Sequence, residues 1–387
     1  MIRTYDDLEL GYVREVLQRG QLGWITPGGM QEQFEKAFAK FVGAKVAMSR
    51  NNAMNGLAEA ISVSGAGTAT EVLCDPIVHF GALAAVWFNA VPRFVDVEYD
   101  TYNMDPASLR ANITDLSRAV VVTHHWGYPA RIDEIRQICD EHGLFLIEDC
   151  AHAVGCYYQG KHVGTFGNMG VFSFQEYKQL TTGDGGMSIT NDEALADKIR
   201  NVWRFSGESP AFMTLNWRMN EVTAAIGLAQ LQRVQGYLDN VYNVTLGILN
   251  EAIKDCSWLK TRAVLPGSQV SGYWWASTWE GDKRGLSYNR FKQLNDELKI
   301  GLRFGFNQTP PYEFEFFRGP TVYKHPDCPT RCPYYVYKSD YRYVPGLTPV
   351  TEDLMPRLVT AGLIFLEVPQ AREMAEKLHE AIYLMEK

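Results

Sequence analysis

Apolar positions along the first 220 residues follow two alternating patterns. Stretches in which apolar residues recur every three or four positions predict helices, and the clearest is 30–42, where Phe34, Phe38 and Phe41 precede Gly43. Short β-branched runs between these stretches predict strands. The predicted helices cover residues 6–20, 30–42, 53–63, 81–89 and 132–141, and the predicted strands cover residues 46–48, 71–74, 93–97, 119–123 and 144–147. Because these strands are apolar at nearly every position, they are typical of a parallel sheet with helices on both faces.

The pattern changes near residue 220. Long amphipathic helices are predicted at 220–239 and 242–254, followed by a strand at 270–279 and helices at 288–298 and 371–385. We therefore predict an α/β fold with two parts. Residues 1–250 form a three-layer large domain with a mainly parallel central sheet and an N-terminal helical arm, and residues 251–387 form a smaller C-terminal α+β domain. The aromatic, proline-rich stretch 309–349 is expected to contribute mostly core side chains.

Composition and charge exclude several classes of protein. The chain has 387 residues, 46% of them hydrophobic, and a net charge of −8 from 37 basic and 45 acidic residues. For such a folded, acidic chain we expect no nucleic-acid partner and no binding to an anionic membrane. No apolar run approaches the roughly 20 residues of a membrane span, and the start of the chain lacks an apolar signal region, so a cytoplasmic location is expected.

The seven cysteines are scattered and odd in number, which argues against a disulfide framework. Cys328 and Cys332 lie close together, but no second pair of cysteines or histidines follows at zinc spacing. No metal site is therefore predicted.

The segment 172–186 carries the first candidate for catalysis. Its sequence, FSFQEYKQLTTGDGG, places Lys178 between a short apolar strand and a glycine-rich turn. Glycines at such a turn let the backbone approach a ligand closely and adopt positive φ. Taken alone, a lysine here is more simply explained as a solvated side chain beside a surface turn.

Two further segments follow predicted strands. Asp149 comes just after the apolar run 144–147, and ligands in open α/β sheets bind at the carboxyl ends of strands. A carboxylate there suits a ring nitrogen that must stay protonated, although aspartate also caps many helices. The segment 49–57 runs from a strand end into a helix, where the free amides of the first turn favour a phosphate. Asn and Ser begin many ordinary helices, so this segment by itself does not single out a phosphate.

Together these segments resemble the DegT/StrS family of pyridoxal-phosphate-dependent sugar aminotransferases, which have the aspartate aminotransferase-like fold type I. The resemblance covers nearly the whole chain. It rests on QEQFE at 31–35, PRFVDV at 92–97, Asp149 followed by Lys178 within the pattern SF-x-x-x-K-x-x-x-TG-x-GG, and LNWRMNE at 215–221 ahead of AAIG at 224–227. The run CPTRCPYY at 328–335 is similar to the branch that contains cyclitol aminotransferases and amino-hydroxybenzoate synthase.

The resemblance implies a role for each matching residue. Lys178 forms the internal Schiff base with pyridoxal 5'-phosphate and moves a proton between Cα of the donor and the cofactor, and Asp149 pairs with the pyridinium nitrogen. The other implied cofactor contacts are Asn52, Ala53 and Ser173 at the phosphate, His152 near the phenolic oxygen, His79 stacked over the ring, and Asn216 reaching the phosphate from a neighbouring subunit. The last contact implies a homodimer with shared active sites. A packed interior histidine is the alternative for His152, and Phe80 replaces His79 if the alignment shifts by one position.

The chain departs from the family pattern in three places. Asn51 and Asn52 stand where the family has glycine and threonine. Asparagine tolerates the left-handed backbone region and keeps a donor, but it does not keep the hydroxyl geometry. Asp184 replaces the glutamate of the family's TGEGG turn and keeps its charge. Val78 and His79 replace a threonine–aromatic pair, which changes the expected substrate pocket.

The implied function is amino-group transfer by a ping-pong reaction. An amino acid donor, glutamate or glutamine by resemblance, gives its amino group to a keto-sugar, keto-cyclitol or related ketone. The family's dehydratases carry histidine in place of the lysine, so Lys178 disfavours dehydration, whereas an aromatising synthase keeps the lysine and stays open. A catalytically silent binding or regulatory protein would explain the altered phosphate loop but not the intact Asp149, Ser173 and Lys178. A nicotinamide dehydrogenase is disfavoured because the glycines at 65–67 precede a strand instead of following it.

Several other charged residues have no assigned role at this stage. Arg303, Arg342 and Lys338 are candidates for binding a donor carboxylate or a substrate phosphate, and the sequence does not choose among them. His124 and His125 lie at a strand end, where structural histidines are expected.

Overall fold

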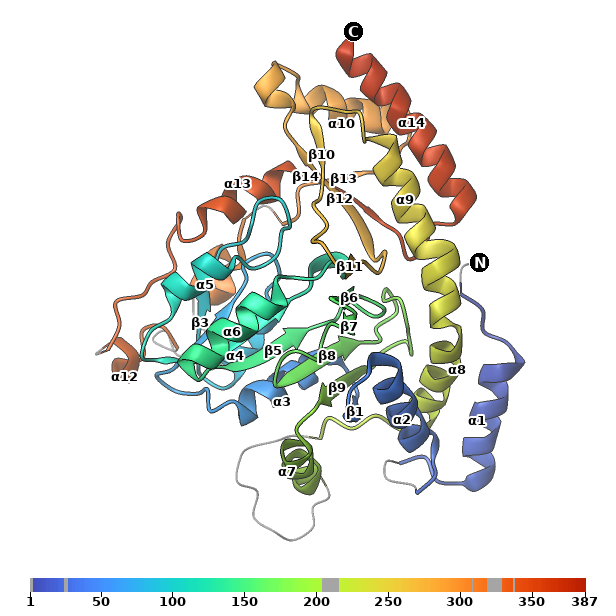
Figure 1. Ribbon diagram of the computed structural model, residues 1–387, viewed down its shortest axis with the longest axis vertical. Helices are drawn as coiled ribbons and strands as arrows, with labels where there is room; N and C mark the ends of the chain where they lie inside the picture. The colour runs from blue at the N-terminus through green and yellow to red at the C-terminus, as the bar shows by residue number, and fades with distance from the viewer. Residues whose placement is uncertain (1–2, 24–26, 204–215, 308, 319–328, 337) are drawn as a thin grey trace.

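A seven-stranded sheet forms the centre of the molecule (Figure 1). The computed structural model describes residues 3–23, 27–203, 216–307, 309–318, 329–336 and 338–387. In the order β1-β9-β8-β5-β4-β2-β3, all neighbouring strands are parallel except that β9 runs antiparallel to both β1 and β8. The strands are β1 (Val46–Arg50), β2 (Glu71–Cys74), β3 (Val91–Phe94), β4 (Ser117–Thr123), β5 (Phe145–Asp149), β8 (Met169–Ser173) and β9 (Gly186–Thr190).

The strand directions bring many chain ends to one side of the sheet. In the register, Asp149 lies level with Thr123, and Gly186, the first residue of β9, lies level with both Ser173 and Arg50. We use the name carboxyl edge for the strand ends Arg50, Cys74, Thr123, Asp149 and Ser173 together with Gly186. This edge is where ligands bind in parallel α/β sheets.

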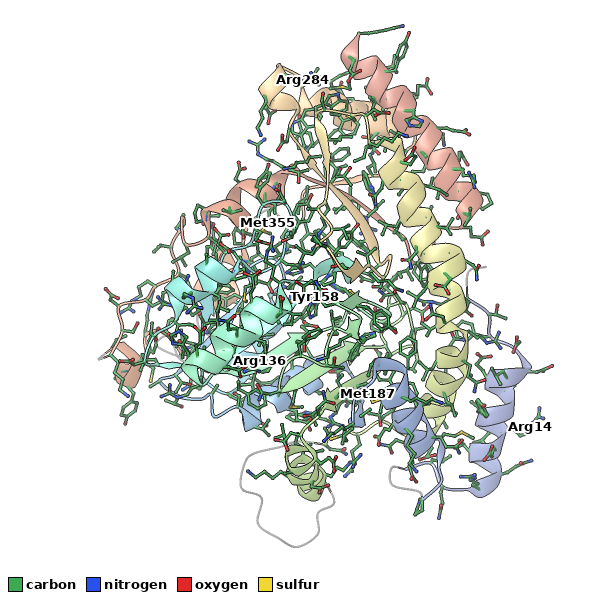
Figure 2. All side chains as sticks on the ribbon, in the orientation of Figure 1. Arg14, Arg136, Tyr158, Met187, Arg284 and Met355 are labelled. Atoms are coloured by element: carbon green, nitrogen blue, oxygen red, sulfur yellow. The ribbon has the colours of Figure 1, made fainter. Side chains whose placement is uncertain are left out.

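Helices cover both faces of the sheet, as the apolar strand pattern predicts. The helices on one face are α3 (Ala53–Val63), α4 (Phe80–Trp87) and α7 (Glu193–Trp203), and those on the other are α2 (Met30–Val42), α6 (Ile132–His142) and α8 (Glu221–Tyr237). Alternate strand residues serve the two faces, so that in β4 Val121 packs with the first group while Val120 and Val122 pack with the second. Their side chains fill the space between the three layers (Figure 2).

A long helical rod joins the two parts of the molecule. α8 continues through one π-helical turn, η2 (Leu238–Tyr242), into α9 (Asn243–Ala252). α1 (Asp7–Arg19) lies beside α8 (Figure 1), and Arg233 of α8 donates to the carboxylate of Asp6, the N-cap of α1, at 2.5 Å. α1 therefore begins at a capped residue that is also tied to the rod.

The smaller sheet is antiparallel and has the order β10-β12-β14-β13. Its strands are β10 (Leu259–Thr261), β12 (Trp274–Trp279), β13 (Arg303–Phe304) and β14 (Leu358–Gly362). Trp275 and Trp279 on one face pack against α9, α10 (Tyr288–Glu297) and α14 (Val368–Glu386). Trp274 and Leu358 belong to the opposite face and pack into the core of the large domain. This second face of the small sheet is the one that can contribute to a site between the domains.

Shorter elements complete the chain. They are α5 (Pro106–Asn112), η1 (His125–Gly127), β6 (Tyr157–Tyr158), β7 (Lys161–His162), β11 (Ser268–Gln269), η3 (Gly281–Arg284), η4 (Pro311–Glu313), α11 (Glu315–Arg318), α12 (Pro333–Val336) and α13 (Pro349–Arg357). β11, β6 and β7 form a separate three-stranded sheet.

The aromatic segment 309–349 packs back onto the large domain. Tyr312 lies with its ring centre 5.2 Å from that of Phe94 on β3, and the Phe94 amide donates to the Tyr341 hydroxyl at 2.9 Å. The Tyr335 hydroxyl donates to Glu71 on β2 at 2.7 Å. Many of these aromatic side chains are therefore core, although Tyr334 is exposed and Tyr323 lies outside the described residues. The domain boundary at residue 250 stays a prediction, since part of the C-terminal portion covers the large sheet.

The predicted fold class is confirmed by the mainly parallel, helix-covered sheet. α2 and α3 begin and end at the predicted residues. The strand predicted at 93–97 is instead Val91–Phe94, because Asp96 leaves the ladder and its carboxylate accepts the amides of Val350 and Thr351 at 2.8 and 2.9 Å. The pattern gives no sign of the reversed strand β9.

Two further findings concern cysteines and membrane spans. The cysteines in the described part of the chain are all free, namely Cys74, Cys139, Cys150, Cys156, Cys256 and Cys332. Cys328, which lies four positions before Cys332 in the sequence, is outside the described residues. Among the described ranges, no helix has both the length and the apolar composition that crossing a membrane requires.

Candidate active site

Asp149 occupies the middle of the carboxyl edge, as the last residue of β5 between β4 and β8. Its side chain is buried, and Oδ1 accepts the Ala151 amide at 3.0 Å. Burial raises the pKa of this carboxyl, while the Ala151 amide and the charge of Lys178 act to lower it. The ionised carboxylate is thus stabilised first by the hydrogen bond from the Ala151 amide and next by the charge of Lys178.

Lys178 reaches the same edge from the loop 174–185, which joins β8 to β9. The lysine amine lies 3.2 Å from the hydroxyl of Tyr273 and 4.8 Å from the centre of the tyrosine ring. Burial lowers the pKa of Lys178 to about 8, and Asp149 acts in the opposite direction. An amine with this pKa is substantially neutral near pH 8, which is the form that acts as a nucleophile.

Side chains from distant parts of the chain hold the turn that carries Lys178. Arg3 is buried, and its guanidinium donates to the carbonyl oxygens of Glu176 and Lys178. The Gln179 side-chain amide donates to the carbonyl oxygen of His152 at 2.7 Å and to the Ser271 hydroxyl at 2.9 Å. The lysine loop is therefore fixed by contacts on both sides of residue 178 in the sequence.

His152 is linked to Lys178 by Tyr273, which contacts both side chains. The imidazole and the tyrosine ring are stacked, with centres 4.4 Å apart and planes at 12°. The Trp126 amide faces His152 Nδ1 at 3.4 Å, so this nitrogen is the acceptor. Burial, with the charge of Lys178 as the next cause, holds the pKa of His152 well below its usual value. His152 is thus a neutral, buried ring stacked on the tyrosine that contacts Lys178, and its place near the phenolic oxygen stays a prediction.

The start of α3 offers groups for an anion. The Asn52 side chain caps the helix by accepting the Asn55 amide at 2.9 Å, and the amides of Ala53 and Met54 have no protein acceptor among the described residues. Gly186 touches this turn, because a Cβ there would lie 2.7 Å from the Ala53 nitrogen. The position accepts only glycine without a shift of one of the two backbones.

Ser173 ends β8 opposite Gly186. Its hydroxyl oxygen faces the Gln175 amide at 3.4 Å, which leaves the O–H free to donate. Of the predicted phosphate contacts, Asn52 and Ala53 therefore follow β1 and Ser173 ends β8, with Gly186 of β9 between them.

The two remaining predicted cofactor contacts are His79 and Asn216. The ring of His79 lies 4.6 Å from that of Phe80 and 6.0 Å from that of Phe314, and it has no contact with Lys178, Asp149 or His152 among the interactions described. Asn216 is exposed, with its Oδ1 3.5 Å from the Arg218 amide. Its neighbour Trp217 accepts the Asn51 amide at 2.9 Å, so Asn216 lies near the end of β1 of its own chain.

The sequence reasoning missed Asp75, which follows β2 at the carboxyl edge. Asp75 Oδ1 lies 2.7 Å from Nε2 of the buried His125, and Asp75 also accepts from Thr123 at the end of β4. These interactions, the His125 charge first, hold the pKa of Asp75 below its usual value against the effect of burial. The sequence signal was available, because Asp75 bears the same relation to its strand as Asp149.

His124, the next residue, belongs to a different network. His124 Nε2 lies 3.0 Å from Glu148, and His124 Nδ1 accepts the Ala130 amide. Glu148 also accepts the amides of Gly164 and Phe166 at 2.7 and 2.8 Å. With Cys150, His124 and Glu148 lie close enough to hold a metal ion, but the imidazole and the carboxylate are already engaged by these bonds. This cluster is therefore explained as an anchor for the turn after Val163.

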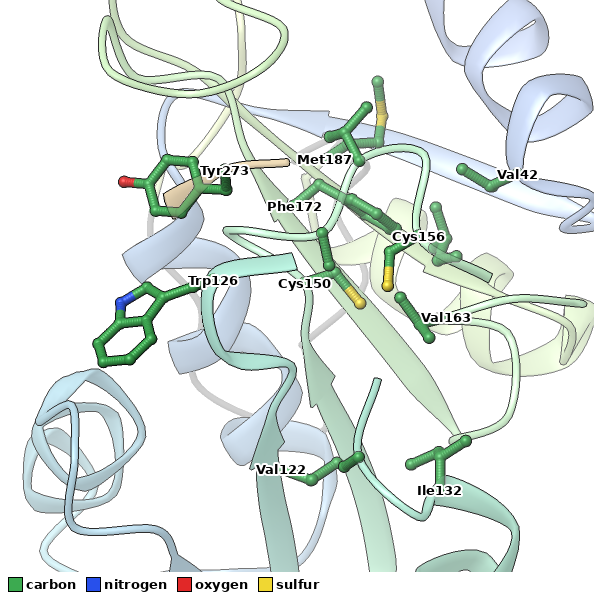
Figure 3. Close-up of a cluster of buried hydrophobic side chains, with 14 of the residues drawn as sticks. Val42, Val122, Trp126, Ile132, Cys150, Cys156, Val163, Phe172, Met187 and Tyr273 are labelled. Carbon is green, nitrogen blue, oxygen red and sulfur yellow. The ribbon is translucent and has the colours of Figure 1, made fainter. Parts of the chain in front are cut away.

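An aromatic stack leads from the lysine to Arg303. Trp274 is stacked between Tyr273 and Trp126, at 6.2 Å from each ring. Figure 3 shows Tyr273 and Trp126 on the same side of the strand end that carries Cys150. The Arg303 guanidinium lies 5.4 Å from the Trp274 ring, on the sheet face that turns toward the large domain. Arg342 and Lys338, by contrast, lie on the segment that covers β3.

Tyr273 and Trp274 were not singled out by the sequence. The available signal was Gly272, whose φ is +53° and where a Cβ would lie 2.6 Å from the Tyr242 backbone. A glycine forced by such a close approach marks a fixed turn, and the residue after it is fixed with it.

The donor set at the carboxyl edge fits a phosphorylated, aldehyde-bearing ring with a protonated nitrogen. Lys178 supplies an amine of lowered pKa, Asp149 supplies a buried carboxylate, and the first turn of α3 with Ser173 supplies free donors for a phosphate. These are the groups by which pyridoxal phosphate is held and activated in proteins.

Comparisons with known proteins agree with this geometry. Residues 4–363 match the DegT/DnrJ/EryC1/StrS aminotransferase family. The chain is 38% identical over 311 residues to GDP-perosamine synthase of Caulobacter vibrioides, covering 77% of this chain and 80% of that protein. It is 32% identical over 343 residues to the spore coat polysaccharide biosynthesis protein SpsC of Bacillus subtilis, covering 84% of this chain and 87% of that protein.

Solved structures resemble the whole chain. 3-Amino-5-hydroxybenzoic acid synthase superposes with a TM-score of 0.82 at 25% identity, covering 98% of this chain and 97% of that one. DesI, solved in the presence of its TDP-sugar product, superposes with a TM-score of 0.80 at 25% identity, covering 99% and 92%.

Proposed function

Because the chain belongs to the DegT/DnrJ/EryC1/StrS aminotransferase family, we propose that it uses pyridoxal phosphate to move an amino group from an amino acid to a keto group on a sugar or cyclitol. The observation that carries this proposal is the meeting of Lys178 and Asp149 at one edge of the sheet, where each influences the other's pKa. Residues 178 and 149 belong to different elements, and only the fold brings them together.

The residues that hold the cofactor follow from the donor set. Asp149 would keep the ring nitrogen protonated, and the amides of Ala53 and Met54 with the Ser173 hydroxyl would bind the phosphate. When bound, pyridoxal phosphate supplies an electron-withdrawing ring that accepts the electron pair left when the donor's Cα loses a proton.

Lys178 moves the protons of the reaction. With a pKa of about 8, a substantial fraction of its amine is neutral at pH 8, and neutral Nζ would be the base that takes a proton from the donor's Cα. The Tyr273 hydroxyl, 3.2 Å away, orients Nζ, and the stacked His152 holds the tyrosine ring in place. Burial is what favours the neutral form of the lysine, and the neutral His152 ring contributes packing and not charge.

The donor is an amino acid, with glutamate or glutamine implied by the family resemblance. Among the three cations that the sequence offered, Arg303 is the one beside the aromatic stack that ends at Lys178, and its fork of donors matches a carboxylate. We therefore assign the donor carboxylate to Arg303. The acceptor is a keto-sugar or keto-cyclitol, and the relatives that act on nucleotide-linked sugars favour an acceptor of that kind.

An aromatising synthase of the same family is the second candidate. It is favoured by the similarity to 3-amino-5-hydroxybenzoic acid synthase and by the presence of Lys178, which both reactions need. The amino acid half-reaction distinguishes them: an aminotransferase leaves the amine form of the cofactor and a free keto acid, and the synthase alternative does not.

The first test is formation of the cofactor complex. We expect purified protein incubated with pyridoxal phosphate to show a visible absorption band that borohydride removes, with the cofactor mass left on the peptide that contains Lys178. Lys178→Ala removes the band, whereas Lys40→Ala, at an exposed position of α2, leaves it unchanged. A band that persists in Lys178→Ala, or a wild-type protein that forms none, contradicts the proposal.

A further inference from the structure

A second carboxylate lies close to Asp149 on the carboxyl edge. β2, β4 and β5 are adjacent strands, Asp149 ends β5 level with Thr123 of β4, and Asp75 follows β2 and accepts from Thr123. Both carboxylates are buried, and the charge of Asp75 raises the pKa of Asp149. Two like charges in a dry interior destabilise each other unless a cation compensates one of them.

His125 is placed to offset the charge of Asp75 through a hydrogen bond. Its imidazole is wholly buried, its Nε2 lies 2.7 Å from Asp75 Oδ1, and its Nδ1 has no hydrogen-bond partner within the described residues. Its charge acts to lower the pKa of Asp149 as well as that of Asp75. The histidine therefore stands in the electrostatic reach of both carboxylates while bonding only one.

The backbone around His125 is held in an unusual conformation. The next residue, Trp126, is buried with φ of +55°, in the left-handed region. Arg262 supports this turn by donating to the His125 carbonyl oxygen at 2.7 Å, and Asn103 Oδ1 accepts the His125 amide at 3.1 Å. Such strained positions persist where the surroundings over-determine them, and they gather at functional sites.

We propose that Asp75 and His125 form a positioning pair for Asp149, in which His125 offsets the charge of Asp75 and so leaves Asp149 as the ionised carboxylate that meets the cofactor's ring nitrogen. Lys178 also acts on the Asp149 carboxylate, and Arg262 lies behind the turn, where it donates to the His125 carbonyl oxygen. This inference rests on the proposed function, since it assigns residues to the same cofactor site. It gives His125 a role beyond that of a structural histidine.

The test measures the affinity of the apoprotein for pyridoxal phosphate as a function of pH, followed by tryptophan fluorescence. His125→Gln leaves Asp75 uncompensated, so Asp149 takes up a proton at a higher pH than in the wild type. We expect an affinity about tenfold weaker at pH 7, and the pH below which affinity falls moves upward by about one unit. Thermal unfolding of each apoprotein is recorded in parallel.

The double variant decides between an electrostatic and a merely structural role. Asp75→Asn with His125→Gln removes the Asp75 charge together with its hydrogen-bonding partner, so we expect its affinity and pH midpoint to return to within about threefold and a few tenths of a unit of wild type. His124→Gln is the matched control, because this neighbouring histidine is equally buried and also bonds a carboxylate. It is expected to lower thermal stability without moving the pH midpoint.

The outcomes are distinguishable from failure of the proposed function. If the wild type binds pyridoxal phosphate but the double variant is no better than His125→Gln, or if His124→Gln moves the midpoint equally, the positioning pair is wrong and the proposed function stands. If the wild type does not bind the cofactor at any pH, the proposed function fails, and this inference fails with it.

Discussion

At the scale of single residues, the site works by balancing burial against a few charges. Burial lowers the pKa of Lys178 and raises the pKa of Asp149. The charge of each residue partly opposes the shift that burial causes in the other. The geometry thus prepares one neutral base and one anion within a single edge, although burial alone favours the neutral form of both.

The titration of Lys178 gives a prediction for the apoprotein. Folding lowers the pKa of Lys178 from 10.5 to about 8, so between these pH values the unfolded chain binds more protons than the folded one. Below pH 8 the charged, buried lysine therefore reduces the stability of the folded state. This loss of stability disappears as the pH rises toward 10.5. We therefore expect labelling of Lys178 by trinitrobenzenesulfonate, read by peptide mass, to have a midpoint near pH 8.

The direction of coupling gives the control. Asp149 acts to raise the pKa of Lys178, so Asp149→Asn lowers the labelling midpoint of Lys178 further. The exposed Lys40 is the internal control, because the substitution leaves its labelling unchanged. A midpoint for Lys178 that matches Lys40 contradicts the site described above. So does a midpoint that rises in Asp149→Asn.

At the scale of elements, the lysine loop is shaped by its ends and by one distant side chain. The Phe174 amide donates to Gly185, and the Thr182 amide donates to Phe174, both at 2.9 Å, which ties the loop across its base. Arg3, ahead of α1, bonds the carbonyl oxygens of Glu176 and Lys178 from outside the sheet. The N-terminal segment therefore takes part in ordering the candidate active site.

Removing the clamp, by which we mean the Arg3 hydrogen bonds to Glu176 and Lys178, is expected to loosen the loop 174–185. We expect Arg3→Ala to speed amide hydrogen exchange in 174–185 by about tenfold or more, because charge-assisted hydrogen bonds contribute roughly 1.5–3 kcal/mol each. Arg14→Ala, at an exposed position of α1, is the matched control and leaves the loop unchanged. Equal protection of the loop in Arg3→Ala and wild type would show that the clamp has no energetic weight.

Element positions were also where the sequence was most informative. Helix caps and apolar spacing placed α2 and α3 correctly because their start and stop signals are local. Tyr273 and Asp75 escaped notice because their roles depend on contacts with Lys178 and His125, which are remote in the sequence. The sequence also gave no way to separate Arg303 from Arg342, since only the pairing of β13 with β14 shows which face carries the guanidinium.

At the scale of the whole molecule, the remaining question is whether two chains complete each site. Asn216 is exposed and near the end of β1 in its own chain, and the family resemblance assigns it to the phosphate of a neighbouring subunit. We propose a homodimer in which Asn216 crosses to the partner's site.

Mixed dimers test this arrangement. A dimer of one Lys178→Ala chain and one Asn216→Ala chain contains one intact site if Asn216 acts across the interface, and no intact site if Asn216 acts within its own chain. With chains carrying different tags, we expect the purified mixed dimer to show about half the amino-transfer activity of wild type, whereas each homodimer has less than a tenth. An inactive mixed dimer, or a monomer in sedimentation, contradicts the shared site.

The reversed direction of β9 has a thermodynamic consequence. Because the strand returns antiparallel to β8, both ends of the loop 174–185 are anchored in the same sheet before any small molecule arrives. The conformational entropy of Lys178 is therefore lost largely when the chain folds and not when a ligand binds. The free energy of substrate binding at this site then depends on the contacts made with the ligand, because ordering the lysine reduces it little.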